Sequence, residues 1–146
     1  MANAVKWSAK TDRGAVLAAE LNALASGAYS AAGTEVDNSV NRDQWAAVEI
    51  SLAALTPTAG AYISVYLITA PDGASYEDAP SATNPAFHDL VATVSVATGA
   101  GAKRAITAWF RIPPTKFKIV VLNGTGVALA ATTNAANLFT ANDEIQ

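Results

Sequence analysis

Residues 45–69, WAAVEISLAALTPTAGAYISVYLIT, contain two segments in which apolar and more polar side chains alternate. A period of two is typical of a β-strand, because successive side chains point to opposite faces. The shared aliphatic faces consist of Ala46, Val48, Ile50 and Leu52 in the first segment and of Ile63, Val65 and Leu67 in the second. Since Pro57 and Gly60 lie between the segments, we predict that the two strands pair as an antiparallel hairpin that buries both faces.

Further strand signals follow, separated by turn-forming residues. PDG at 71–73 favours a tight turn, and residues 74–89 read as a long surface loop. LVATVSV at 90–96 and RAITAWFRI at 104–112 are predicted strands on either side of a TGAGA turn. In the second of these strands the predicted common face consists of Ile106, Ala108 and Phe110.

The segment IPPTKFKIVVLNGTG at 112–126 contains two adjacent prolines before another alternating run. Pro113 and Pro114 cannot donate ladder hydrogen bonds, so we predict a rigid corner at which strand pairing is interrupted. The strand that follows is predicted to place Phe117, Ile119 and Val121 on one face, and NGTG is predicted to reverse the chain through positive backbone angles.

Residues 1–13 are expected to form an extended arm in which Trp7 is an apolar anchor. Next, AVLAAELNALASG at 15–27 has three leucines at helical spacing, which predicts one short helix. Several short strands separated by turns predict an all-β fold for residues 14–146, a single-domain two-sheet sandwich with a jelly roll as one form of it. An up-and-down barrel is the alternative.

Composition excludes several classes of protein. The chain has 146 residues, no cysteine and one histidine, which fits one domain without disulfides or thiolate metal sites, and one histidine is too few for the usual zinc sites. A net charge of −3 argues against general nucleic-acid binding. No apolar run approaches the roughly 20 residues that a membrane span needs.

Residues that could carry chemistry are few. His88 lies beside Asp89, but adjacent residues on an extended segment point apart, and no G-x-S-x-G motif accompanies them. Asp72, Glu77 and Asp78 offer oxygen ligands without the spacing of an EF-hand, so calcium binding is the weaker alternative to an ordinary acidic loop. We therefore expect no catalytic residues, no metal site and no cofactor.

Two groups of side chains suggest binding surfaces. Tyr62 and Tyr66 share a strand face that Trp45 or Trp109 could adjoin, and such an aromatic platform would suit a carbohydrate-binding module, although aromatic cross-strand pairs also stabilise sheets. The second group consists of basic residues in a region of the sequence without acids. These residues are either solvated on strand faces or form a basic patch that faces an acidic protein. They are Lys103, Arg104, Arg111, Lys116 and Lys118.

Three segments are similar, in combination, to a family of small β-rich structural proteins of tailed bacteriophages. They are ELNALASGAYSAAGTEVDNS at 20–39, EISLAALTPTAGAYISVYLITAPDG at 49–73 and IPPTKFKIVVLNGTGVALAATTN at 112–134. The resemblance covers most of the chain, from about Glu20 to Asn142. It implies a virion component and favours a capsid cement or decoration protein on the outer surface of the shell. Tail and head–tail connector proteins are the alternatives within the same resemblance.

A cement protein of this kind is expected to bind the major capsid protein and to self-associate, with a homotrimer as one form that matches local shell symmetry. Nucleic acid and membrane are not expected partners. Trp buries a large area and Arg makes directional charge-assisted bonds. We therefore hypothesise that Trp7 and the basic group contribute to subunit contacts. That group is Lys103, Arg104, Arg111, Lys116 and Lys118.

Overall fold

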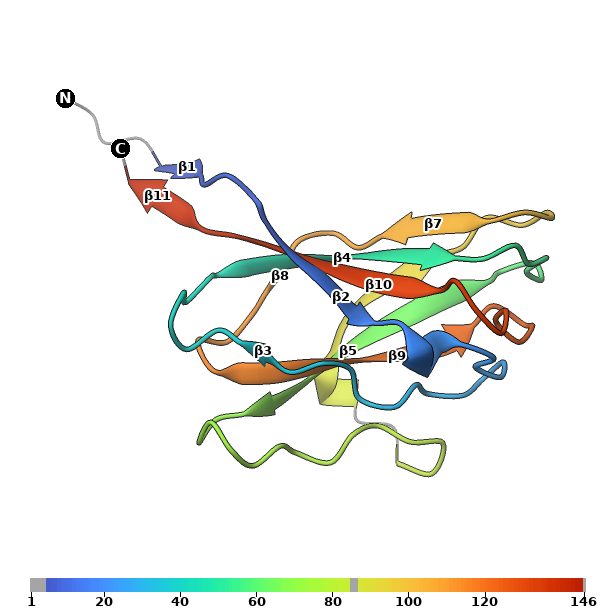
Figure 1. Ribbon diagram of the computed structural model, residues 1–146, viewed down its shortest axis with the longest axis horizontal. Coiled ribbons are helices and arrows are strands. Elements are labelled where there is room, and N and C mark those ends of the chain that lie inside the picture. The colour runs from blue at the N-terminus through green and yellow to red at the C-terminus, as the bar shows by residue number, and fades with distance from the viewer. Residues whose placement is uncertain (1–4, 85–86, 146) are drawn as a thin grey trace.

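The computed structural model describes residues 5–84 and 87–145 and is built from antiparallel β-sheets (Figure 1). Within these ranges the helical elements are single 3₁₀ turns, η1 (Ala19–Leu21) and η2 (Phe87–Asp89). In the same ranges no helix is long and apolar enough to cross a membrane. The all-β expectation is confirmed, in a sandwich-like arrangement of two sheets.

A five-stranded sheet and a four-stranded sheet form the body of the protein. The first has the order β2 (Thr11–Leu17), β10 (Ala135–Ala141), β4 (Trp45–Leu52), β7 (Lys103–Ile106), with β8 (Phe110–Arg111) also paired to β4. The second has the order β3 (Val36–Asp37), β9 (Lys116–Gly124), β5 (Tyr62–Ala70), β6 (Leu90–Ser95). A separate pair, β1 (Val5–Trp7) with β11 (Asp143–Ile145), projects beyond the two sheets (Figure 1).

The main core lies between the two sheets and consists of aliphatic side chains from both. Val48 and Ile50 of β4 and Ile63 and Val65 of β5 are all fully buried there, so the predicted aliphatic faces are confirmed. The predicted hairpin is wrong, because β4 pairs with β10, β7 and β8, whereas β5 pairs with β9 and β6. Two strands with one apolar face each can bury it side by side or face to face, and here they face each other across the core.

The four-stranded sheet is also covered on its outer face. Tyr66, Ile68 and Val120 form a second buried cluster, against which Tyr29 and Tyr76 pack from neighbouring loops. This cover explains why both faces of β5 are buried, although its sequence alternates in the manner of a half-exposed strand.

The two prolines lie where the chain passes from one sheet to the other, between β8 and β9, so the predicted corner is confirmed. Asn38 Nδ2 donates to the Pro113 carbonyl at 2.8 Å and fixes this corner. The interpretation of NGTG is wrong in part: β9 continues through Gly124, and of the two glycines only Gly126 has a positive φ, +81°. Gly124 instead faces Tyr62, because a Cβ built on it would lie 2.5 Å from the tyrosine ring.

The helix predicted over 15–27 is also wrong. Residues 11–17 form β2, which pairs with β10, and only the single turn η1 follows. Leu17 and Leu21 are nevertheless buried in the core, so these leucines are apolar because they are buried and not because they form one face of a helix. The first three residues of β2 belong to the stretch expected as the arm.

The predicted strand over 104–112 is interrupted after β7. Glu49 of β4 pairs with Ile106 and Ala46 pairs with Phe110, so three residue steps along β4 correspond to four along the segment from β7 to β8. The extra residue is accommodated at Thr107, whose Oγ1 accepts a hydrogen bond from Val48 N at 3.0 Å. Because of this bulge, Ile106 faces outward while Phe110 packs against the core, which contradicts their predicted common face.

Candidate functional site

The outer face of the five-stranded sheet carries an aromatic cluster to which the terminal strand β1 contributes. The Trp7 ring stacks on Trp45 of β4 with centroids 5.6 Å apart, and it meets Trp109 edge-on at 5.3 Å. Trp7 remains 53% exposed and Trp109 37% exposed, so the cluster is packed internally and still presents aromatic surface to solvent. The hypothesised anchor Trp7 therefore holds the terminal strand against the sheet and also forms part of its surface.

Cationic side chains lie over two of these aromatic rings. The Arg111 guanidinium is 4.1 Å from the Trp45 ring centroid, and Lys10 Nζ is 4.4 Å from that of Phe139 on β10. Trp45 Nε1 donates to Asp143 Oδ2 at 3.1 Å, which joins the cluster to β11. We call the whole surface the aromatic face, defined by Trp7, Trp45, Ile106, Trp109 and Phe139 with Lys10, Arg104 and Arg111.

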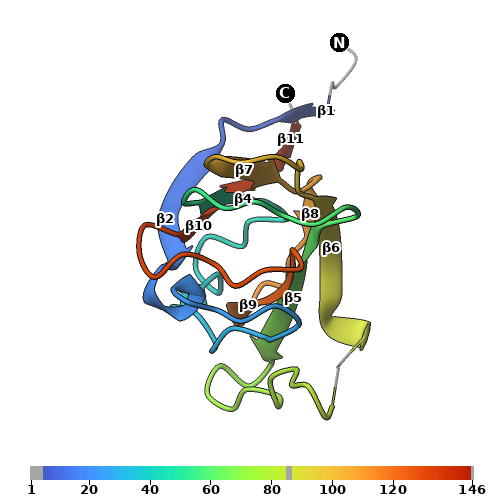
Figure 2. The ribbon, with the colours of Figure 1, turned by 90° about the vertical axis from the view of Figure 1, so that its right-hand side faces the viewer.

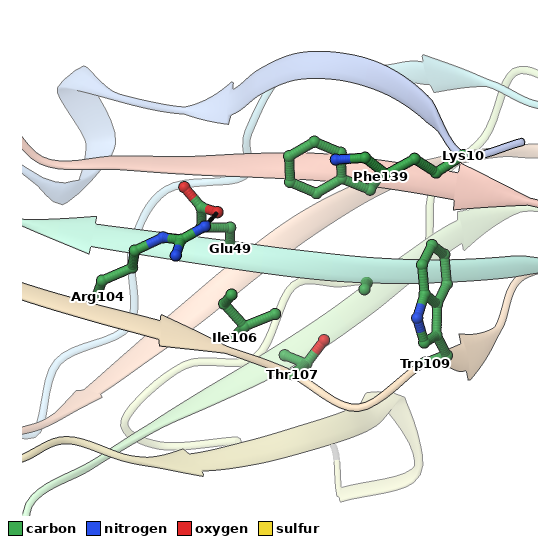
Figure 3. Close-up of a pocket in the computed structure, with 8 residues that line it drawn as sticks. Lys10, Glu49, Arg104, Ile106, Thr107, Trp109 and Phe139 are labelled. Atoms are coloured by element: carbon green, nitrogen blue, oxygen red, sulfur yellow. Dashed lines mark hydrogen bonds and ion pairs between the residues drawn. The ribbon is translucent and has the colours of Figure 1, made fainter.

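A shallow depression of about 180 Å³ lies within the aromatic face (Figure 3). Phe139 and Trp109 contribute aromatic walls, while Ile106, which is 50% exposed, contributes an aliphatic one. Arg104 donates to Glu49 at one end, and this hydrogen bond lowers the pKa of the Glu49 carboxyl. An apolar surface bordered by oriented charges is suited to recognition of another molecule.

The terminal strands are tied to the sheet by a polar network at their base. Ser8 and Asn142 exchange two hydrogen bonds of 2.8 Å, Ser8 N to the Asn142 carbonyl and Asn142 N to Ser8 Oγ. Asn142 Nδ2 also donates to Asp43 at 3.0 Å, and Asp43 forms an ion pair with Arg13 of β2. Burial alone would raise the pKa of Asp43, but hydrogen bonds from Thr140 and Arg13 outweigh that effect and lower it.

The basic group predicted from sequence is divided between the two sheets. Lys103, Arg104 and Arg111 belong to the five-stranded sheet, whereas Lys116 and Lys118 lie on β9 of the other. Lys116 is paired with Glu35 at 2.9 Å, and the ammonium of Lys118 is 4.4 Å from the Tyr76 ring centroid. The structure therefore brings Arg104 and Arg111 onto the aromatic face with Trp7, while Lys116 and Lys118 lie on a different face.

The aromatic platform expected around Tyr62 and Tyr66 is not formed. Both tyrosines belong to β5 of the four-stranded sheet, whereas Trp45 and Trp109 lie on the outer face of the opposite sheet. Tyr66 is buried against Tyr29 with centroids 5.4 Å apart, and burial raises its pKa to about 12. The combination of Tyr and Trp residues proposed from sequence is thus ruled out by sheet membership.

His88 and Asp89 do not point apart as expected, because they lie in the tight turn η2 rather than on an extended segment. His88 Nε2 is 3.1 Å from Asp89 Oδ1 and 3.7 Å from Glu77 Oε2. Asp72 is used differently, since its Oδ1 accepts from the backbone N–H groups of Ala74 and Ser75. Asp72 and Glu77 therefore have different partners: Asp72 caps its own turn, whereas Glu77 lies near His88 together with Asp89.

Sequence reasoning missed Lys10, Phe139 and Ile106 as parts of the aromatic face. Phe139 belongs to β10, whose alternation in AANLFTA is weak because alanine and asparagine fill its other positions. The sequence feature that could have identified Phe139 is its position next to Leu138. Adjacent residues of a strand point to opposite faces, so one of these side chains lies in the core and the other outside. The outward position of Ile106 depends on the bulge at Thr107, which has no sequence signature.

No protein-family model matches this chain, and no curated protein matches it.

Proposed function

We propose that this chain is a structural protein of a tailed-phage virion, a cement or decoration protein that binds the major capsid protein at the outer surface of the shell. The observation that carries the proposal is the aromatic face, with Trp7, Ile106 and Trp109 exposed beside a strand pair that projects from the sandwich (Figures 1 and 2). A projecting pair extends the reach of the molecule across a junction, while the sandwich remains a rigid platform.

The order of the strands supports this interpretation. Along the chain, β2 to β5 alternate between the two sheets, β5 and β6 pair directly, and β6 to β10 alternate again, with β8 as an extra strand. Sheet orders β2-β10-β4-β7 and β3-β9-β5-β6 match a jelly roll built from two Greek keys, which we propose as the finer description of the sandwich. Jelly rolls occur in viral capsid domains and in lectins.

The composition of the aromatic face suits a protein partner. Trp and Arg are enriched at the energetic centres of interfaces. On this face the Arg111 guanidinium lies over the Trp45 ring, and Trp7 lies beside Trp109. A decorated shell presents many equivalent sites, so moderate affinity at each is sufficient when copies also contact one another. We therefore include self-association, with a homotrimer as one form, in the proposal.

Abundance in purified particles is the first test. Quantitative mass spectrometry would measure copies of this chain relative to the major shell protein. We expect a ratio close to stoichiometric for a cement protein. A trace ratio would transfer the assignment to a tail or connector protein, and absence from particles would overturn the virion proposal.

Occupancy of the shell by variants tests the surface itself. Trp109→Ala together with Ile106→Asp should reduce binding to undecorated shells by at least tenfold, because both side chains are exposed on the aromatic face. Lys118→Glu, on the four-stranded sheet, is the matched control and should bind normally. Equal occupancy for the face variant and the control would refute docking through this surface.

Carbohydrate binding is a second candidate, which the depression between Phe139 and Trp109 favours because aromatic walls and a Glu49–Arg104 pair suit sugar rings and hydroxyls. A glycan array probed with the purified chain separates the candidates. We expect the chain to bind no glycan on the array. Binding to a glycan that is lost in Trp109→Ala would favour a receptor-binding module instead.

A further inference from the structure

A second cluster of polar side chains lies far from the aromatic face, on the long connection between β5 and β6. Figures 1 and 2 show this connection at the opposite end of the molecule from β1 and β11. It brings together Glu77 from the connection itself and His88 and Asp89 from η2, with one potential ligand atom from each lying within 4.8 Å of the others.

Glu77 is held in place by the adjacent strand. Its Oε1 accepts hydrogen bonds from Thr69 N at 2.8 Å and from Thr69 Oγ1 at 3.1 Å. The backbone N–H of Glu77 in turn donates to the Thr69 carbonyl at 3.2 Å. One carboxylate oxygen is therefore used by β5, while the other, Oε2, is directed toward His88 at 3.7 Å.

Asp89 supplies an independent observation that points to a ligand. Its side chain is only 4% exposed, and its Oδ2 is buried with no hydrogen-bond partner among the described residues. A buried carboxylate oxygen without a donor is costly, and few native polar groups are left in that state. The site therefore brings two carboxyl groups and one imidazole together.

We propose that Glu77, His88 and Asp89 bind a divalent first-row transition-metal ion, with Zn²⁺ as the ion that fits best. Ligands about 2.0–2.2 Å from a tetrahedral zinc ion are about 3.3–3.6 Å apart. His88 Nε2 is 3.1 Å from Asp89 Oδ1 and 3.7 Å from Glu77 Oε2, and the ligand atoms of all three residues lie within 4.8 Å of one another, so a small adjustment brings them to these separations. The imidazole discriminates against Ca²⁺ and Mg²⁺, which take oxygen ligands.

Such an ion would enter from solvent and connect two parts of the loop. The His88 side chain is 77% exposed, which leaves room for water to complete the coordination. Asp89 directly precedes β6, and Glu77 is bonded to Thr69 near the end of β5. The ion therefore closes the base of the connection between these strands, and binding should stabilise the folded state.

Isothermal titration of the metal-stripped full chain with ZnCl₂ is the test. We expect one Zn²⁺ per chain, a higher melting temperature with the ion, and at least tenfold weaker affinity for CaCl₂ and MgCl₂. His88→Ala should weaken Zn²⁺ binding at least tenfold while its circular dichroism spectrum stays unchanged, because this side chain is exposed. The matched control is Asp78→Asn, an exposed acid of the same loop outside the cluster, which should bind normally.

A second measurement does not depend on a variant. CoCl₂ added to the full chain should give visible absorption bands of a four- or five-coordinate site, and one equivalent of ZnCl₂ should abolish them. The proposal is overturned if Zn²⁺ does not bind, if His88→Ala binds it as well as the unmodified chain, or if Co²⁺ keeps the spectrum of the hydrated ion. None of these outcomes bears on attachment to a shell.

Discussion

Single buried polar residues hold the loops of this protein onto its sheets. Asn123, fully buried in β9, donates through Nδ2 to the carbonyls of Leu24 and Val127, each at 2.9 Å. Its Oδ1 accepts from Thr125 N and from Thr125 Oγ1. One side chain thus satisfies groups in two loops that are distant in sequence, which a turn-forming asparagine in NGTG does not suggest.

Replacing Asn123 with alanine should lower the free energy of unfolding by about 2–3 kcal/mol, because the buried Thr125 N–H loses its partner and the Leu24 and Val127 carbonyls each lose one of two hydrogen bonds. Urea unfolding followed by tryptophan fluorescence measures the change. Asn137→Ala, on the outer side of β10, is the control and should cost less than about 1 kcal/mol. Similar losses for the two variants would contradict the role of the buried network.

Asp43 should make stability depend on pH in the acid range. Its pKa is lowered in the folded protein, so its contribution is complete above the unfolded value of about 4 and is lost as pH falls through the folded value. At pH 7, Asp43→Asn should cost about 1.5–3 kcal/mol through loss of a charged partner for Arg13. Urea unfolding at pH 7 and pH 3 should show a smaller difference at the lower pH, because part of the contribution of the carboxylate has been lost there. A difference that is equal at both pH values would show that the carboxylate charge is not what matters.

At the scale of elements, strand pairing depends on positions where backbones approach closely. Gly33 lies between the two sheets: its N–H donates to the Ile119 carbonyl at 2.9 Å, and a Cβ there would be 2.2 Å from the Val16 carbonyl oxygen. Gly124 is also crowded, but by the Tyr62 ring, which is 40% exposed and free to turn outward. Gly33 is thus crowded by backbone, whereas Gly124 is crowded by a side chain that can move.

These two glycines make a matched pair for mutagenesis. Gly33→Ala should lower the free energy of unfolding by about 2–3 kcal/mol, because the added methyl group meets backbone that cannot move without breaking the pairing of β2 and β9 to this segment. Gly124→Ala should cost less than about 1 kcal/mol, because the Tyr62 ring can rotate. Chemical unfolding of both variants measures the two losses in the free energy of unfolding. Equal losses would mean that backbone adjustment relieves the contact with Val16.

At the scale of the whole molecule, the terminal strand pair is attached to the sandwich without completing its core. β1 pairs with β11 outside the two sheets, and its contribution to packing is the contact of Trp7 with Trp45 and Trp109. The strand pair therefore extends the aromatic face but contributes little to the stability of the sandwich.

Deletion of residues 1–9 should therefore leave the sandwich folded, with a loss of about 1–2 kcal/mol from the missing aromatic contacts and the two hydrogen bonds between Ser8 and Asn142. Circular dichroism and thermal melting would measure this, while shell occupancy should fall at least tenfold. An unfolded truncated chain would instead make the arm an essential part of the fold. Unchanged occupancy by a folded one would remove the arm from the docking surface.

The strand class and the inward faces of the main strands could be predicted from residue patterns. Alternation reports which side of a strand is apolar, and the apolar sides of β4, β5 and β9 are buried as predicted. The prolines fixed the corner before β9, because a residue without an N–H cannot continue a ladder. The hypothesised contact group contained Trp7, Arg104 and Arg111, but it also contained Lys116 and Lys118, which lie on the other sheet.

Strand pairing and the composition of the surfaces depend on packing between segments that are distant in sequence. A strand with one apolar face has the same pattern whether its partner lies beside it or across the core, so β4 and β5 could not be assigned to opposite sheets from sequence. The bulge at Thr107 and the weakly patterned β10 decide which side chains join Trp7 outside. The approach of Glu77 to His88 likewise depends on the path of a long loop, which local residue preferences do not specify.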